Sequence, residues 1–199
     1  MIRVPGRPRI QAVDEAVRES VQTLLLTEGY RKLSIEKVAA HAGIGKAAIY
    51  RRWSTKAEMI FAATFHDLAL PPAKDHGSLE ADLLDLCEKL VGIFTTPQAR
   101  QAFAGLMTDL QTEPAFKERF ALAYTTAEAA RIREILDRAV ERGELAPIDN
   151  IANIHALLLG TVLAHTLLLD RSSLPGLAKW LTNTVVATLE KAGCFNEND

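Results

Sequence analysis

The sequence contains few cysteines, and their spacing excludes the commonest uses of that residue. Only Cys87 and Cys194 occur in the 199 residues, and no C-x-x-C pair is present for a metal or redox site. Two cysteines so far apart predict reduced thiols in a cytoplasmic protein. The basic N-terminus also lacks the apolar segment of a signal peptide. We therefore expect no disulfide framework, no metal and no cofactor.

Long hydrophobic runs and alternating patterns are also scarce. The most apolar stretch, residues 151–169, still contains two histidines, an asparagine and a glycine, which favours a buried helix over a membrane span. No stretch alternates apolar and polar residues over a useful length, so we expect no β-strands. Aromatic residues make up only 6% of the chain, whereas alanine and leucine are abundant. The composition therefore predicts an all-α protein.

Catalytic motifs are absent as well. The five histidines have no H-x-x-x-H or H-E-x-x-H spacing, and the chain lacks G-x-S-x-G, a P-loop and a dinucleotide-binding glycine pattern. Around residues 130–144, opposite charges at helical spacing predict a solvated helix face with ion pairs, not a catalytic dyad. The charges in question are Arg131, Glu134, Asp137, Arg138 and Glu141. We therefore expect that the protein is not an enzyme.

Charge is unevenly distributed along the chain. Residues 1–56 contain eleven Lys and Arg against five Asp and Glu, a net charge of +6, whereas the remainder carries −8. Such asymmetry indicates a front end that binds a polyanion, attached to an acidic body. The charge distribution alone is also compatible with surface charges that are unevenly distributed and have no binding role.

The chain does contain strong helical periodicity, divided by glycines and prolines. Ser34 and Thr55 have the chemistry of helix N-caps, and Gly29 and Gly43 stand where helices end. A linker is expected over residues 71–77, where prolines cannot continue a helix. About nine helices are predicted, near residues 10–28, 34–42, 46–53, 55–70, 78–95, 98–111, 114–142, 149–170 and 175–192.

Residues 34–53 have the spacing of a helix-turn-helix. Ala39 is small where two helices would cross closely, and Gly43 follows four residues later, where the chain must turn with positive φ. In the third helix, Ile49 and Trp53 lie four residues apart and are expected to face the core. These features together predict a compact unit that presents the third helix to a partner.

The opposite face of the third helix is basic, aromatic and small, as a helix that enters the DNA major groove requires. Lys46, Tyr50 and Arg51 supply donors for phosphates or guanine edges, and Ala47 and Ala48 supply clearance. Donors outside this helix are expected at phosphates or in the minor groove. These are Lys56 at the start of the next helix, and Arg7 and Arg9 in a basic arm. The alternative for each cation is a solvated surface charge.

The segment EGYRKLSIEKVAAHAGIGKAAIYRRWSTKAEMI resembles the DNA-binding domain of TetR-like transcriptional regulators. The shared pattern is a glycine-aromatic pair, a Ser/Thr-opened helix, A-x-x-A-G-[VI], K-x-x-[LI]-Y and a final [ST]-K-x-E. The resemblance extends over about residues 10–65, and beyond them it is one of architecture only. It implies a basic flexible arm at 1–9, a three-helix helix-turn-helix domain at 10–56 and a helical effector-binding and dimerisation domain at 57–199.

Several residues match positions that contact DNA in this family. One departure is Gly45, where many relatives have Ser or Thr; glycine still caps a helix but removes a hydroxyl contact. Ser54, where proline is frequent, is a neutral departure. Arg52 lies nearer the flank of the helix, and the sequence does not decide its role. The matching residues are Ser34, Lys46, Ala47, Ala48, Tyr50, Arg51 and Lys56, and we add Gly45, Arg7 and Arg9 to the candidate DNA-binding set.

The last two expected helices are candidates for a dimer surface. The stretch at 151–169 is apolar nearly all round, more than one side of a small domain can bury, so pairing with a second copy would form a four-helix interface. The resemblance implies the same arrangement. A purely internal core helix is the alternative. The candidate dimer residues are Leu158, Thr161, Val162, His165, Trp180 and Thr184.

The middle helices are expected to hold a small-molecule effector, with aromatic residues around an apolar cavity. Aromatics at helical spacing are also typical of an ordinary core, so this alternative stays open. The candidate ligand residues are Phe94, Phe103, Met107, Phe120, Tyr124 and His155.

These observations predict a cytoplasmic homodimer that binds a palindromic double-stranded DNA operator as a repressor released by an unidentified small molecule. Two other functions remain open: a sequence-tolerant architectural DNA binder, and a helical ligand-binding protein or enzyme with an incidental basic front end.

Overall fold

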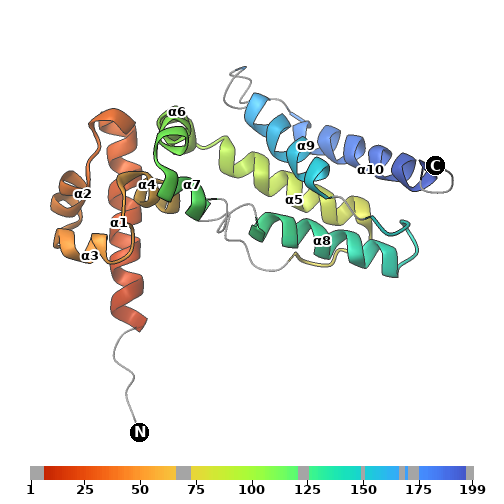
Figure 1. Cartoon of the computed structure of the whole chain (residues 1–199), viewed down its shortest axis with the longest axis horizontal. Coiled ribbons are helices and arrows are strands. Elements are labelled where there is room, and N and C mark those ends of the chain that lie inside the picture. The colour runs from red at the N-terminus through yellow and green to blue at the C-terminus, as the bar shows by residue number, and fades with distance from the viewer. Residues whose placement is uncertain are drawn as a thin grey trace, which may run out of the picture. The chain divides into compact units, whose positions relative to one another are not determined.

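The computed structural model describes residues 7–65, 73–120, 126–148, 151–165, 169 and 175–195. Over this part of the chain the secondary structure is entirely helical, as the composition predicts. The helices, shown in Figure 1, are α1 (Arg7–Glu28), η1 (Tyr30–Lys32), α2 (Ile35–Ala42), α3 (Lys46–Tyr50), α4 (Lys56–Thr64), α5 (Leu79–Phe94), α6 (Pro97–Thr112), α7 (Pro114–Phe120), α8 (Thr126–Glu141), α9 (Ala152–Leu163) and α10 (Leu177–Phe195).

Several helix bounds differ from the sequence-based expectation; the helix expected over 55–70, for example, ends at Thr64. Helix α1 begins at Arg7, so residues 7–9 are helical and the expected arm of residues 1–9 is too long; residues 1–6 lie outside the described part. The single helix expected over 114–142 is two helices, α7 and α8, and residues 121–125 between them are not described. Helix α3 ends at Tyr50 instead of Trp53, and the chain turns at residues 51–52.

The helices form two compact units. The first contains the described residues 7–65 and 97–119, that is α1 to α4 together with α6 and most of α7. The second contains α5 and α8 to α10. The division differs from the expected boundary after residue 56, because α4 and α6 pack on α1 and on each other.

A core of aliphatic side chains stabilises the first unit. Helix α1 contributes Val17, Val21 and Leu25, which are completely buried against α2, α4 and α6. Ile49 of α3 and Met59 of α4 are also fully buried. Each side chain of this kind contributes about 1.5–3 kcal/mol when removed from water. The apolar stripe that predicts α1 is therefore the stripe that faces the core.

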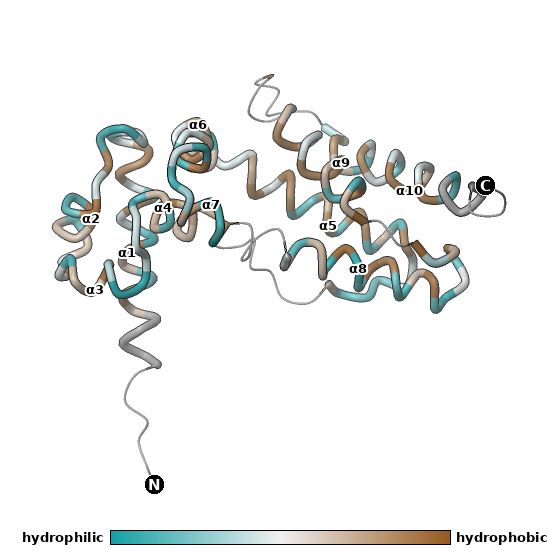
Figure 2. The backbone as a smooth tube through the Cα atoms, viewed as in Figure 1, coloured by the Kyte–Doolittle hydropathy of each residue, from teal (hydrophilic) through white to brown (hydrophobic). Residues whose placement is uncertain are grey.

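The second unit is built around α5, which contacts α8, α9 and α10. Leu83, Ile132, Leu158 and Leu181, one from each of these helices, are at most 1% exposed. Cys87 of α5 is also buried, and this burial raises the pKa of its thiol to about 11, which keeps it protonated at neutral pH. Figure 2 shows that hydrophobic residues follow α9 over much of its length.

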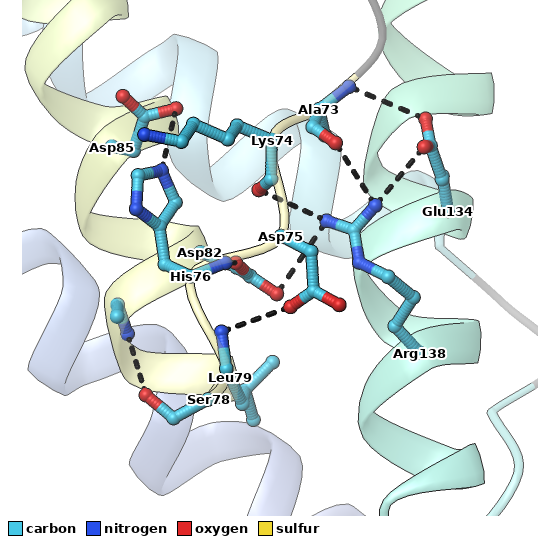
Figure 3. Close-up of polar contacts among 12 residues, drawn as sticks. Ala73, Lys74, Asp75, His76, Ser78, Leu79, Asp82, Asp85, Glu134 and Arg138 are labelled. Atoms are coloured by element: carbon cyan, nitrogen blue, oxygen red, sulfur yellow. Dashed lines mark hydrogen bonds and ion pairs between the residues drawn. The ribbon is translucent and has the colours of Figure 1, made fainter.

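A polar cluster joins α8 to the segment before α5 (Figure 3). Arg138 donates to the backbone carbonyls of Ala73 (3.0 Å) and Lys74 (3.3 Å) and to Asp82 (3.4 Å). The Asp82 side chain is completely buried and also accepts from the backbone N–H of His76 at 2.7 Å. Arg142 adds a second ion pair to Asp82 at 3.3 Å. The cluster fixes the start of α5.

The expectation of a solvated charged face on α8 is wrong for two of its residues. Arg131 is only 8% exposed and pairs at 2.8 Å with Glu128, which is buried as well. Arg138 is mostly buried among the partners above. Arg131 pairs within α8, whereas Arg138 faces Asp82 of α5 and the segment before it. The ion pairs expected from i,i+4 spacing do occur, between Arg138 and Glu134 at 3.0 Å and between Arg133 and Asp137 at 3.9 Å.

Candidate nucleic-acid interface

Helices α2 and α3 form the helix-turn-helix that the spacing predicts. The Ser34 hydroxyl caps α2 by accepting from the backbone N–H of Lys37 at 3.3 Å. The helix ends at Gly43, whose φ of 66° is the left-handed conformation that favours glycine. Ile44 then donates its backbone N–H to the Ala39 carbonyl at 3.0 Å, which closes the turn. Because Ala39 is small and buried, α3 can follow directly across α2.

Ile49 anchors α3 to the first unit, and Trp53 is half-buried. The residues on the other side face solvent: the Lys46 side chain is 57% exposed and Tyr50 is 51% exposed. Gly45, Ala47 and Arg51 are exposed too, and Ala48 is half-buried. The structure therefore has the outward face of basic, aromatic and small residues that the sequence predicts.

The cations of this face have few partners. Lys46 lies 3.6 Å from Glu36, and both side chains are 57% exposed, so water screens the pair. The backbone N–H of Glu36 and the Ser34 hydroxyl hold the pKa of Glu36 below its usual range, and Lys46 adds to this effect. Within the described residues, Arg51 has no ion-pair partner. Both cations can therefore turn toward phosphates or base edges without breaking a buried contact.

Arg52 differs from its neighbour. It pairs with Asp14 of α1 and donates to the Ala48 carbonyl at 3.2 Å, and its side chain is 19% exposed. These contacts connect the turn after α3 to α1. Arg52 accordingly has a structural role in this unit.

Helix α4 begins with part of the capping box that T-x-x-E predicts: Thr55 is the N-cap, but the Glu58 carboxylate binds the backbone N–H of the preceding residue, Ser54. Thr55 accepts from the backbone N–H of Glu58 at 3.1 Å, and the Glu58 carboxylate accepts from the backbone N–H of Ser54 at 2.6 Å. Glu58 is buried and also pairs at 3.2 Å with Arg119 of α7, a partner that no local sequence signal reveals. Lys56, in the first turn, is half-buried, and burial lowers its pKa.

Gly45 takes the N-cap position of α3, with φ −73° and ψ 140° and no side-chain cap. Its carbonyl accepts from the backbone N–H of Ala48 at 2.9 Å. A Cβ built on Gly45 would have no heavy atom within 4 Å, so the site has room for the Ser or Thr that the resemblance to TetR-like regulators implies at this position. Arg7 and Arg9 lie in the first turn of α1.

Comparisons with known proteins agree with this geometry. Residues 23–63 match the family of bacterial regulatory proteins, tetR family, and residues 73–185, more than half of the chain, match the Tetracyclin repressor-like C-terminal domain. The chain belongs to the TetR family. It is a helix-turn-helix transcriptional regulator that binds DNA.

TetR-family relatives match over most of the chain. An HTH-type transcriptional regulator of Mycobacterium tuberculosis is 29% identical over 166 residues, which cover 82% of this chain and 80% of that protein. The crystal structure of the TetR family regulator SCO0332 matches with a TM-score of 0.65 and 28% identity, over 89% of this chain and 96% of that one. NalD, the secondary repressor of the MexAB-OprM multidrug efflux pump in Pseudomonas aeruginosa, has a TM-score of 0.64 and 22% identity, over 92% and 98% of the two chains, and shares the fold.

The residues predicted to hold an effector fall in both units of this TetR-family chain. Phe103 and Met107 lie half-buried on α6 in the first unit. Phe94, Phe120 and His155 lie in the second unit, where Phe94 is buried and the other two are half-buried. Burial lowers the pKa of His155. Tyr124 lies outside the described residues.

The predicted dimer residues divide into two groups. Leu158 and Val162 are completely buried within the chain, so they belong to the core of the second unit, and the prediction that they form a surface for a second copy is wrong. Trp180 is 55% exposed, and Thr161, His165 and Thr184 are half-buried. The ring centroids of His165, which follows α9, and Trp180 of α10 lie 6.4 Å apart in an edge-to-face arrangement.

Among the described residues, no group of three or more His, Cys, Asp and Glu side chains could hold a metal ion. None of the described helices combines the length and apolarity needed to span a membrane.

Proposed function

We propose that this TetR-family protein is a homodimeric repressor that binds a palindromic operator and is released by a small molecule. The observation that carries the proposal is the outward face of α3, where Lys46, Tyr50 and Arg51 are exposed beside the small Ala47. A single helix-turn-helix covers only a few base pairs, so two copies on two half-sites provide the required specificity.

The helix-turn-helix unit of each copy, called the head below, contacts both base edges and phosphates. Lys46 and Arg51 donate to guanine edges or phosphates, Tyr50 contacts the groove, and Ala47 and Ala48 allow close approach. Other contacts position the head on the phosphate backbone, and they come from Ser34, Lys56, Arg7, Arg9 and the backbone of Gly45.

Dimerisation is proposed through the exposed sides of α9 and α10. These helices contact each other, and Trp180 presents an exposed aromatic ring there, a residue type enriched at protein interfaces. His165 lies against that ring, and Thr161 and Thr184 lie on the same two helices. The buried Leu158 and Val162 support this surface from inside the second unit.

The effector is proposed to bind in the second unit, where Phe94 and Phe120 supply apolar surface and His155 a polar group. A ligand that binds one arrangement of the heads more tightly shifts the protein away from the operator. Two half-sites fall about one helical turn apart, roughly 34–36 Å, so a small change in the separation of the heads abolishes the fit.

Genome-wide mapping of bound DNA, followed by binding titrations on the sites found, tests the proposal. A palindromic site should outcompete random duplex at several salt concentrations, because base contacts add to the phosphate contacts. Lys46→Ala and Arg51→Ala should each weaken binding about tenfold. Lys117→Ala, an exposed lysine of α7, is the matched control and should bind as the wild type does.

Two results contradict the proposal. Equal competition by random duplex would establish a sequence-tolerant architectural binder. Unchanged DNA affinity in both Lys46→Ala and Arg51→Ala would contradict the proposed DNA contacts.

A further inference from the structure

Tyr30 of η1 lies buried against α6, within the first unit. Its hydroxyl donates a hydrogen bond to the Asp109 carboxylate. Gly105, one turn before Asp109, faces the ring: a Cβ built there would lie 2.0–2.4 Å from three ring atoms. No side chain fits at such a distance, so the missing Cβ of Gly105 allows the ring to reach α6. Burial and the bond to Asp109 raise the pKa of Tyr30 far above its usual range, so the hydroxyl remains a donor.

The Tyr30 ring also contacts Lys56. The Lys56 ammonium lies 4.3 Å from the ring centroid, within the range of a cation–π interaction. Burial lowers the pKa of Lys56, and the charges of Asp109 and Glu113 on α6 act in the opposite direction. The ammonium is therefore held against a ring, instead of moving freely in water.

A lysine held in this way loses less conformational freedom when it binds a phosphate. A free lysine side chain loses rotamer freedom when it becomes fixed, and this loss opposes binding. Contact with a ring that is itself fixed from behind by α6 reduces this cost in the complex. The position of the ring thus determines where the ammonium lies when DNA arrives.

We propose that Tyr30 is a positioning residue for Lys56, and that Gly105 and Asp109 of α6 set the position of Tyr30. The proposal rests on the proposed phosphate contact of Lys56. It connects α6 to the DNA-binding surface through a chain of contacts between named side chains: Asp109 to the Tyr30 hydroxyl, Gly105 to the ring, and the ring to Lys56. A change in α6 at these two residues alters DNA affinity although neither residue contacts DNA.

Two substitutions in α6 test the proposal on the full-length protein. Gly105→Ala places a methyl group where the ring lies and displaces it. Asp109→Ala removes the hydrogen-bond acceptor, and simple electrostatics predicts the opposite result, because loss of an acidic group favours binding to DNA. The matched control is Gly92→Ala in α5, where a Cβ meets no atom within 4 Å. Each variant is made in the wild type and in a Lys56→Gln background.

The measurement is operator affinity by fluorescence anisotropy over a range of salt concentrations. One lost phosphate contact lowers the slope of log K against log salt by about 0.9 per head, or about eightfold in affinity at 0.1 M salt. We expect this loss for Lys56→Gln. Gly105→Ala and Asp109→Ala should lower affinity at least about threefold and reduce the slope. In the Lys56→Gln background they should have no further effect, and Gly92→Ala should have none in either.

Thermal unfolding establishes that each variant is folded, and if Gly105→Ala is not, Asp109→Ala decides alone. Wild-type affinity and slope in the folded α6 variants overturn the inference. An equal loss in the Lys56→Gln background also overturns it, because the effect then bypasses Lys56. Should Lys56→Gln bind normally while Lys46→Ala and Arg51→Ala are weakened, the inference fails and the proposed function stands. If none of these variants is weakened, both fail.

Discussion

Arg51 of the first unit and the arginine pair Arg138 and Arg142 of the second unit have opposite surroundings. In the second unit, Arg138 and Arg142 converge on the buried Asp82. In the first unit, Arg51 is exposed and has no ion-pair partner among the described residues. The same side chain thus stabilises the fold where a carboxylate is buried beside it, and is available to DNA where none is. Whether an arginine stabilises the fold or is available to DNA therefore depends mainly on whether a carboxylate lies beside it.

The largest effect on stability is expected when the cluster of Arg138 and Arg142 loses the buried carboxylate of Asp82. Asp82→Ala leaves two arginines and the His76 N–H without their shared acceptor, and should lower the free energy of unfolding by about 3 kcal/mol. Urea unfolding measures the change. Asp137→Ala, whose exposed side chain lies 3.9 Å from Arg133, should cost less than about 0.5 kcal/mol. Equal losses would mean that burial of the carboxylate is unimportant.

A carboxylate placed beside Arg51 should give this arginine an ion-pair partner, as Arg138 and Arg142 have in the second unit, and so compete with DNA for it. Ala47 is exposed and four residues before Arg51, so Ala47→Glu offers an ion-pair partner without disturbing the core. DNA affinity should fall about tenfold below that of Ala47→Gln, which has the same size and no charge. Titration at several salt concentrations should show the difference shrinking as salt rises. A difference independent of salt would argue against a charge effect.

A smaller effect is expected from restoring the missing cap of α3. Gly45→Ser supplies a hydroxyl where the structure has space, and should stabilise the protein by a few tenths of a kcal/mol. It should raise DNA affinity about threefold if the hydroxyl also meets a phosphate. Gly45→Ala adds the Cβ without the hydroxyl. Equal affinities of the two variants would show that the hydroxyl makes no contact with DNA.

The smallest effect concerns the pH dependence of the second unit. Burial lowers the pKa of His155, so the unfolded chain binds a proton near pH 6.5 while the folded chain does so only at lower pH. Stability should therefore decline as pH falls below about 6.5, and level off once the folded group is protonated. In urea unfolding between pH 7 and pH 5, His155→Gln should lose less stability than the wild type. Equal losses would exclude His155 as the source.

The sequence predicts the local parts of the site well. Ser34, Gly43 and the N-cap Thr55 have roles that depend on neighbours within four residues, and the structure contains each of them. The outward face of α3 follows in the same way, because 3.6-residue periodicity separates Lys46 and Tyr50 from Ile49.

Contacts between distant segments are not predicted. Tyr30 and Asp109 are 79 residues apart, and Arg138 and Asp82 are 56 apart, so no spacing rule connects them. The same limit explains the mistake at Leu158 and Val162. An apolar residue in a helix must be covered, but periodicity does not distinguish cover by the same chain from cover by a second copy.

The assignment of α6 and α7 to the first unit has a consequence for protein engineering. The DNA-binding module is discontinuous in the chain: residues 7–65 form it together with residues 97–119, and the segment that contains α5 lies between them. A head cut after residue 65 would lose the α6 and α7 surfaces that cover Tyr30, Phe61 and Glu58. A chimera that grafts this operator specificity onto another regulator should therefore carry both segments, with the junctions placed outside α6 and α7.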